Sequence, residues 1–153
     1  MIVYNATMDY DFEKLAREIT AERLKPLSNV PDAAAEVAAK IILAAVASTR
    51  RRQDPGESVA AVCRGVMSGL VLIEKDLKEP ALAVLGKIGD LAGQLGLDPQ
   101  KMMTAAMTGV ADAAVLGPAP AVYEIRMGID SKFMGAGEVF DRLAELAKAR
   151  RSA

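Results

Sequence analysis

The sequence predicts an all-α fold, a single-domain bundle of six to seven helices in which neighbouring helices are mostly antiparallel. Apolar residues recur at helical spacing in one segment after another. Prolines stand at or just before the start of most of these segments, where a fixed φ and a missing amide hydrogen are tolerated. These prolines are Pro31, Pro55, Pro80, Pro99 and the pair Pro118/Pro120, whereas Pro26 closes the first helix. No stretch has the composition of a linker, so residues 1–153 are expected to form one domain.

The first two helices are indicated by charge at their ends. The first is expected to begin between Asp9 and Asp11, because these residues and Glu13 place negative charge where the helix dipole favours anions. The second is expected from Pro31 to Thr49. The arginine run at positions 50–52 then places cations at the carbonyl end of the second helix, where the dipole favours them.

The third helix has the clearest start signal of the chain, because Asp54 is a good N-cap and Pro55 suits the first helical position. The fourth helix is expected from Pro80 to Leu95. Gly96 follows in the position of a left-handed C-terminal cap, and Leu97 is expected to pack back on the last turn.

The last three helices are less evenly marked. The fifth starts at Asp98-Pro99, carries no charge from Met102 to Ala111 and ends at Gly117, as is typical of a helix in the middle of a bundle. Within residues 118–137 the apolar spacing predicts a short sixth helix, and the final helix is expected from Gly137 to Arg150. The inner side of the final helix is expected to consist of Val139, Phe140, Leu143, Leu146 and Ala147. Basic residues near its end, Lys148, Arg150 and Arg151, are interpreted as charges that complement the helix dipole.

A weak internal similarity joins the third and fifth helices at an offset of 44 residues. Asp54-Pro55 corresponds to Asp98-Pro99, and Gly65-Val66 corresponds to Gly109-Val110. Two helix pairs of similar build could stack as a weak two-helix repeat. The simpler explanation is that capped, alanine-rich helices resemble one another.

Composition excludes several classes of function. The chain has no histidine, which removes the usual general base and metal ligand, so neither a metal nor a cofactor is expected. A net charge of −1 argues against nucleic acid as a partner. No signal peptide or membrane-spanning stretch is expected, and the single cysteine, Cys63, fits a reducing compartment, so we expect a cytoplasmic protein.

Two charges interrupt strongly apolar helices, Arg64 in the third and Asp112 in the fifth. If these helices are antiparallel neighbours, the two side chains could meet in a low-dielectric setting and orient a ligand. The simpler alternative places them in solvent on separate outer faces. The preceding residue, Cys63, shares the apolar stripe of its helix, which favours a buried structural cysteine over a nucleophile activated by Arg64.

Small and flexible side chains suggest contact surfaces. Glycines spaced four apart, Gly65/Gly69 and Gly89/Gly93, would let another helix approach closely, either from the same chain or from a second one. Eight methionines suggest a deformable core, a contact surface or a pocket. Residues 117–137 are a candidate lid or contact segment. The candidate ligand or contact residues are Arg64, Asp112, Met107, Tyr123, Arg126, Met127, Phe133 and Met134.

Three functions remain open from the sequence. The first, which the apolar excess and the missing catalytic groups favour, is a non-enzymatic protein that acts by association, as a homo-oligomer or with a protein partner. The second is a bundle that binds or senses an apolar small molecule in a methionine-lined pocket. The third is an enzyme that uses only carboxylate, lysine or tyrosine groups, although no spacing singles out a pair.

Overall fold

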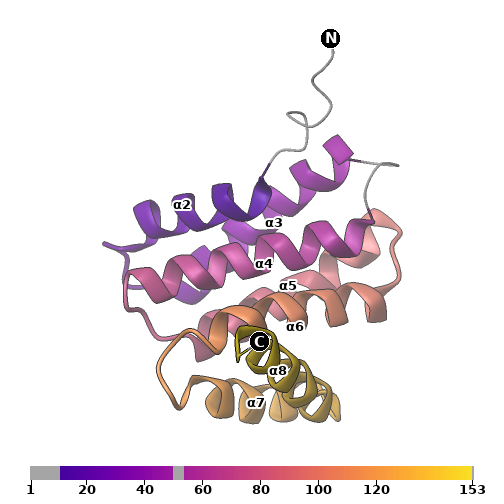
Figure 1. Ribbon diagram of the computed structural model, residues 1–153. Helices are drawn as coiled ribbons and strands as arrows, with labels where there is room; N and C mark the ends of the chain where they lie inside the picture. Colours follow the sequence, from indigo (N-terminus) through magenta and orange to yellow (C-terminus); the bar gives the residue numbers. More distant parts are fainter. Residues whose placement is uncertain (1–10, 50–53, 153) are drawn as a thin grey trace.

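The computed structural model of the chain describes residues 11–49 and 54–152. This part consists of helices joined by short turns and contains no strand, which confirms the all-α prediction (Figure 1). The expected charges at Asp9 and at positions 50–52 lie outside the described residues. The helices are α2 (Phe12–Leu24), α3 (Val30–Thr49), α4 (Pro55–Leu72), α5 (Lys78–Leu95), α6 (Pro99–Ala114), α7 (Ala121–Lys132) and α8 (Ala136–Ser152).

Three helices begin with the same device, an aspartate N-cap. The side chain of Asp11 accepts a hydrogen bond from the amide of Lys14 at 2.9 Å. Asp54 and Asp98 do the same for amides in the first turns of α4 and α6, and each is followed by a proline in the first turn. These bonds satisfy amide groups that have no partner within the helix. The starts expected for the third and fifth helices are therefore confirmed.

Helix α5 differs from its predicted start but has its predicted end. It begins at Lys78, two residues before Pro80, and has no side-chain cap. A proline in the third position is accepted because the first-turn amides have no intrahelical acceptor to lose. At the other end Gly96 is left-handed, with φ 68°, and the amide of Leu97 donates to the carbonyl of Ala92 at 2.9 Å.

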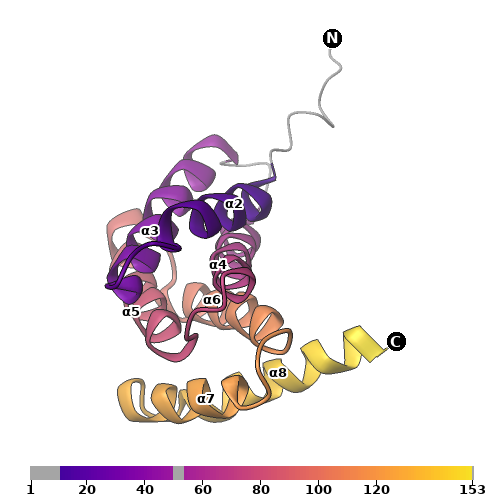
Figure 2. The same cartoon turned by 90° about the vertical axis from the view of Figure 1, so that its left-hand side faces the viewer.

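The first five helices form two layers. Helices α2, α4 and α6 lie side by side in one layer, and α3 and α5 form the other (Figure 2). Consecutive helices run antiparallel, as predicted, because short turns return the chain from one layer to the other. The most extensive contacts join helices two apart in the chain: α2 with α4, α4 with α6, and α3 with α5.

Helices within a layer run parallel to one another. Gly65 of α4 packs against the backbone of Glu13 in α2. One turn further along both helices, Gly69 packs against the backbone of Arg17. In the same way Gly109 of α6 packs against Ala60 of α4. The aspartate-capped starts of α2, α4 and α6 therefore lie at the same end of the layer (Figure 1).

The hairpin of α7 and α8 lies across the side of the stack formed by α5 and α6 (Figure 2). Helix α7 packs on α5, with Gly128 against the side chain of Leu82, and α8 packs on α6. Asp130 fixes the turn, because its carboxylate accepts a hydrogen bond from the amide of Gly137 at 3.1 Å. The short sixth helix expected within residues 118–137 is thus α7, with Ile125 and Ile129 fully buried.

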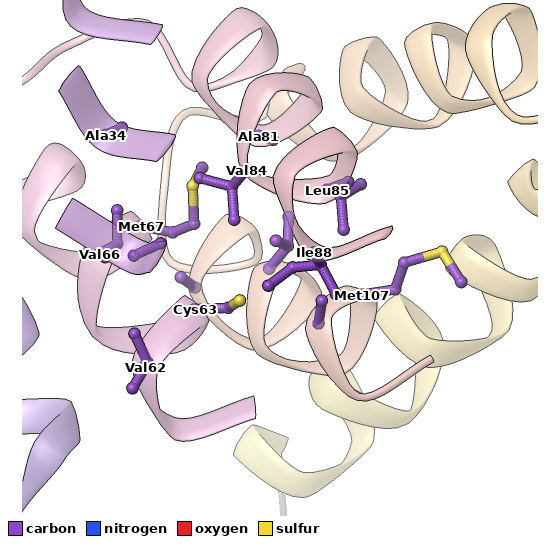
Figure 3. Packing of buried hydrophobic residues seen from close by; sticks show 14 of the residues in the cluster. Ala34, Val62, Cys63, Val66, Met67, Ala81, Val84, Leu85, Ile88 and Met107 are labelled. Carbon is purple, nitrogen blue, oxygen red and sulfur yellow. The ribbon is translucent and has the colours of Figure 1, made fainter. Parts of the chain in front are cut away.

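The core lies between the two layers and extends under the hairpin. Figure 3 shows the side chains of α4, α5 and α6 that meet there, among them Cys63, Met67, Ile88 and Met107. The only buried aromatic ring of the described chain, Phe140, anchors α8 to this core. None of the described helices combines the length and the apolar character that crossing a membrane requires.

Candidate functional site

Four charged side chains form a continuous row across α2, α4, α6 and α8. Arg64 donates from Nε to Glu13 Oε1 and from Nη1 to Asp112 Oδ2, each at 2.8 Å. Asp112 also accepts a hydrogen bond from Arg150 on its other oxygen. The signs alternate along the row, so each charge lies beside an opposite one. We call this row the charge ladder.

Arg64 and Asp112 lie together in the structure, but their helices are not the antiparallel neighbours on which the prediction depends. Helices α4 and α6 are neighbours, but they run parallel rather than antiparallel, because α5 carries the chain back between them. The alternative of two solvated residues on separate faces is not what the structure shows. The side chain of Arg64 is 32% exposed and that of Asp112 is 17% exposed.

The charge ladder is internally neutralised. Burial alone lowers the pKa of Arg64, but hydrogen bonds to Glu13 and Asp112 and the charges of both carboxylates raise it above its ordinary value. Arg64 therefore stays cationic at every physiological pH. Because two arginines are matched by two carboxylates, the ladder presents no unpaired charge to a ligand. Its geometry fits a tie between helices better than a binding site.

Cys63 is a structural residue. Its side chain is fully buried within the core (Figure 3). Burial raises the pKa of the thiol to about 12, although the neighbouring charge of Arg64 opposes this shift. A thiol that is protonated and inaccessible is a poor nucleophile, which supports the structural interpretation of this cysteine.

The two glycine pairs differ in their packing. Gly65 and Gly69 allow α2 and α4 to pack with their backbones in contact, so their partner helix belongs to the same chain. A Cβ added at Gly89 or Gly93 would meet nothing within 4 Å among the described residues. These two glycines therefore have no packing partner within the part of the chain that the structure describes.

The remaining candidate residues do not gather in one pocket. Met107 is 4% exposed and belongs to the core, and Phe133 packs against the core from the end of α7. Tyr123, Met127 and Met134, by contrast, are 62%, 44% and 93% exposed. The structure thus separates the candidates into a buried set and a surface set instead of lining a closed cavity with them.

The surface set belongs to α7 and to the turn that follows it. Tyr123 and Met127 are one turn apart on α7, and Met134 follows in the turn to α8. Leu146 of α8 is 56% exposed, although the apolar spacing predicts it on the inner side of the final helix. It stays outside because Phe140, Ala144 and Ala147 make the buried contacts of α8. We call the exposed surface of the α7–α8 hairpin, which carries Tyr123, Met127, Met134, Leu146 and the hollow described next, the outer face.

A hollow of about 560 Å³ opens between α7 and α8 on this face. Its lining carries charges of both signs together with Leu146. The lining residues are Arg126, Glu138, Asp141, Arg142, Glu145 and Leu146. The Nε group of Arg126 is buried and has no hydrogen-bond acceptor among the described residues. Sequence reasoning identifies Arg126 but not the α8 side chains, which follow a helical spacing typical of any solvated helix face.

Two further hollows lie elsewhere on the surface. One, of about 730 Å³, lies between the starts of α4 and α6, where Asp54 and Asp98 are engaged as helix caps. The other, of about 250 Å³, lies between α2 and α3 and is lined by Ile19, Val37 and Ile41. Within residues 11–49 and 54–152, no cluster of cysteine and acidic side chains has an arrangement that could hold a metal ion.

Comparison with known proteins gives no match: no family model, curated protein or solved structure is significantly similar to this chain.

Proposed function

We propose that this protein is a helical association module that binds another protein chain through the outer face of the α7–α8 hairpin. The observation that supports the proposal is the concentration of exposed apolar side chains there. Of the eight large hydrophobic side chains exposed on the described surface, four belong to this hairpin: Tyr123, Met127, Met134 and Leu146.

The position of the hairpin strengthens this argument. In layered helical proteins, a terminal helix pair needs a polar outer side, because no further pair covers it. The last hairpin of this chain instead exposes tyrosine, methionine and leucine side chains. Tyrosine and methionine are enriched where proteins meet, because a large or flexible apolar side chain gains contact area when it leaves water.

Two other surfaces, the hollow between α4 and α6 and the charge ladder, support association less well. The hollow between α4 and α6 is rimmed by Asp54, Glu57 and Asp98, and the charge ladder is already neutral. Neither presents a group of exposed large apolar side chains. The proposal includes a cytoplasmic location, which the single, buried Cys63 supports because a disulfide framework is excluded.

Site-specific photo-crosslinking in living cells tests the proposal. A photoreactive phenylalanine analogue is introduced at Tyr123 or Met127, and the intact chain is recovered after irradiation. We expect covalent adducts with a protein, whether a second copy or another chain, at both positions. The reason is that both side chains are exposed in the isolated chain and lie on the surface that the partner protein is proposed to cover.

Leu72 provides the matched control. It lies at the end of α4 and is 65% exposed, against 62% for Tyr123, so the analogue is equally accessible at both positions. We expect few adducts from position 72. Equal yields at positions 72, 123 and 127, or no adduct at the latter two, would contradict the proposed function.

A further inference from the structure

The sulfur atoms of the described residues differ sharply in their access to solvent. Met134, in the turn between α7 and α8, has a side chain that is 93% exposed. We propose that Met134 is a site of reversible oxidation, at which a two-electron oxidant such as a peroxide or a hypohalous acid converts the thioether to a sulfoxide. This inference is separate from the proposed association function and does not depend on it.

The other described methionines are less accessible than Met134. An oxidant must reach the sulfur atom, so exposure decides which methionine reacts first. Met127 of α7 is 44% exposed, less than half of the value for Met134. The other four described methionines pack in the core or against it: Met67, Met102, Met103 and Met107. Met134 is therefore the most accessible thioether of the described residues.

The cysteine of this chain does not compete for the oxidant. A cysteine reacts as its thiolate, and its reactivity follows the exposure and the deprotonation of the thiol. Cys63 is the single cysteine, and its side chain is fully buried. Burial raises the pKa of its thiol to about 12, so the thiol stays protonated at neutral pH. A thioether has no proton to lose, so Met134 needs no such activation.

The reaction is the transfer of one oxygen atom to sulfur. A lone pair of Met134 Sδ attacks one oxygen of hydrogen peroxide, the O–O bond breaks and an S–O bond forms. The proton of the transferred oxygen moves to the departing hydroxide, which leaves as water. Sulfur is thereby oxidised by two electrons and the peroxide is reduced. A sulfoxide reductase reverses the change, because two thiols reduce the sulfoxide to the thioether and yield a disulfide and water.

The position of Met134 allows this oxidation without damage to the fold. A sulfoxide is polar, so it would disrupt a core, but it stays hydrated on an exposed side chain. Backbone amides hold the surrounding turn: Ala136 donates to the carbonyl of Phe133 at 2.9 Å, and Gly137 donates to the carboxylate of Asp130 at 3.1 Å. None of these bonds uses the side chain of Met134. The oxidised chain is therefore expected to stay folded and to present the sulfoxide to a reductase.

Peptide mapping after treatment of the purified full chain with hydrogen peroxide tests the site. Trypsin cleaves after Arg126, Lys132 and Arg142, so Met127 and Met134 are read in different peptides. We expect Met134 to be oxidised faster than Met127, and about tenfold or more faster than Met67, which reacts only when the chain opens. Circular dichroism should show unchanged helix content, and methionine sulfoxide reductase with dithiothreitol should remove the added oxygen.

Two controls show whether the structure determines this order. In concentrated urea, where burial is lost, Met67, Met127 and Met134 should be oxidised at similar rates. Met134→Leu keeps an apolar side chain of similar size and should abolish the fastest phase of oxygen uptake, as measured by the mass of the intact chain. Because the side chain is exposed, this variant should keep the helix content of the wild-type chain.

Several results would overturn the inference. They are oxidation of Cys63, Met67 or Met127 before Met134, a fast phase that persists in Met134→Leu, and loss of helix content when Met134 alone is oxidised. A sulfoxide at position 134 that the reductase fails to reduce would overturn the reversibility of the site.

Discussion

Arg64 and Asp112 are joined by a 2.8 Å ion pair although 48 positions separate them in the chain. The pair is the central step of a ladder that also includes Glu13 and Arg150, so four helices are tied by one set of alternating charges. Three of these helices lie in one layer and the fourth belongs to the terminal hairpin. The ladder therefore links the terminal hairpin to the rest of the fold.

Replacing Arg64 with methionine is expected to lower the free energy of unfolding by about 1–2 kcal/mol. Arg64 makes two charge-assisted hydrogen bonds, and a third of its side chain remains exposed, which reduces their value. Urea unfolding followed by circular dichroism measures the change. A double-mutant cycle with Asp112→Asn should give a coupling free energy of roughly 1 kcal/mol between the two residues.

The exposed pair of Lys40 and Glu36 provides the control for the ladder. These side chains are 78% and 69% exposed, and their charged atoms are 3.9 Å apart. Lys40→Met should change the free energy of unfolding by less than about 0.5 kcal/mol. If Lys40→Met cost as much as Arg64→Met, the ladder would have no special role in stability.

Alanine substitutions at glycines are expected to change stability in opposite directions. At Gly65 and Gly109 the new methyl group would collide with the backbone of a neighbouring helix, so each variant should lose about 1–3 kcal/mol. At Gly89 and Gly93 nothing lies within 4 Å, and alanine has the higher helix propensity. Each of these variants should gain about 0.5–1 kcal/mol. Thermal unfolding of the four variants would show the split, and a uniform loss would contradict it.

Helix positions are predictable because their ends carry local signals. Asp54-Pro55 and Asp98-Pro99 begin helices by hydrogen bonds within a few residues, and Gly96 ends one by its own φ angle. The early start of α5 escapes prediction because Lys78 is preceded by no capping side chain. Such signals act over one turn, so they define elements without stating how the elements are arranged.

The arrangement of the site depends on contacts that no local pattern contains. Helices α4 and α6 pack closely because Gly109 lets the backbone of α4 approach, whereas the sequence pattern marks Gly109 only as the counterpart of Gly65. Local patterns explain Glu13 and Arg150 as charges that complement helix dipoles, so they do not predict the part of these residues in the ladder. Nor does helical spacing show that Leu146 stays exposed, because that depends on how far α8 is covered by α6 and α7.

The stability of the protein is expected to fall as pH rises above about 9, in part because of Cys63. The thiol pKa is raised from about 9 in the unfolded chain to about 12 in the folded state. The stabilising contribution of this residue is therefore complete below about pH 9 and is lost as the pH rises from about 9 to 12. In that window the unfolded chain releases a proton that the folded chain retains. Within that window, the free energy of unfolding should therefore fall by roughly 1 kcal/mol per pH unit from this residue.

Comparison with Cys63→Ala isolates this effect. The variant should be less stable at neutral pH, because it leaves a small cavity, but its stability should fall less steeply between about pH 9 and 11. Denaturant unfolding at several pH values measures both slopes. As a second check, iodoacetamide should alkylate wild-type Cys63 at pH 8 only as fast as the protein unfolds. Equal slopes in the two proteins, or rapid alkylation of the folded chain, would show that the thiol is not buried as described.

The capping aspartates are expected to stabilise the fold at one end of the layer. Asp98→Ala removes the acceptor for the amides of Gln100 and Lys101 and should lower the free energy of unfolding by about 1 kcal/mol. Asp98→Ser keeps a side-chain acceptor at the cap and should therefore retain most of the stability of the wild-type protein. Asp90 is the control, since it is also exposed but lies inside α5, where alanine is the better helix former. Asp90→Ala should therefore be neutral or slightly stabilising in the same urea titration. If Asp98→Ala and Asp90→Ala behaved alike, the loss would come from removing a negative charge and not from a lost cap.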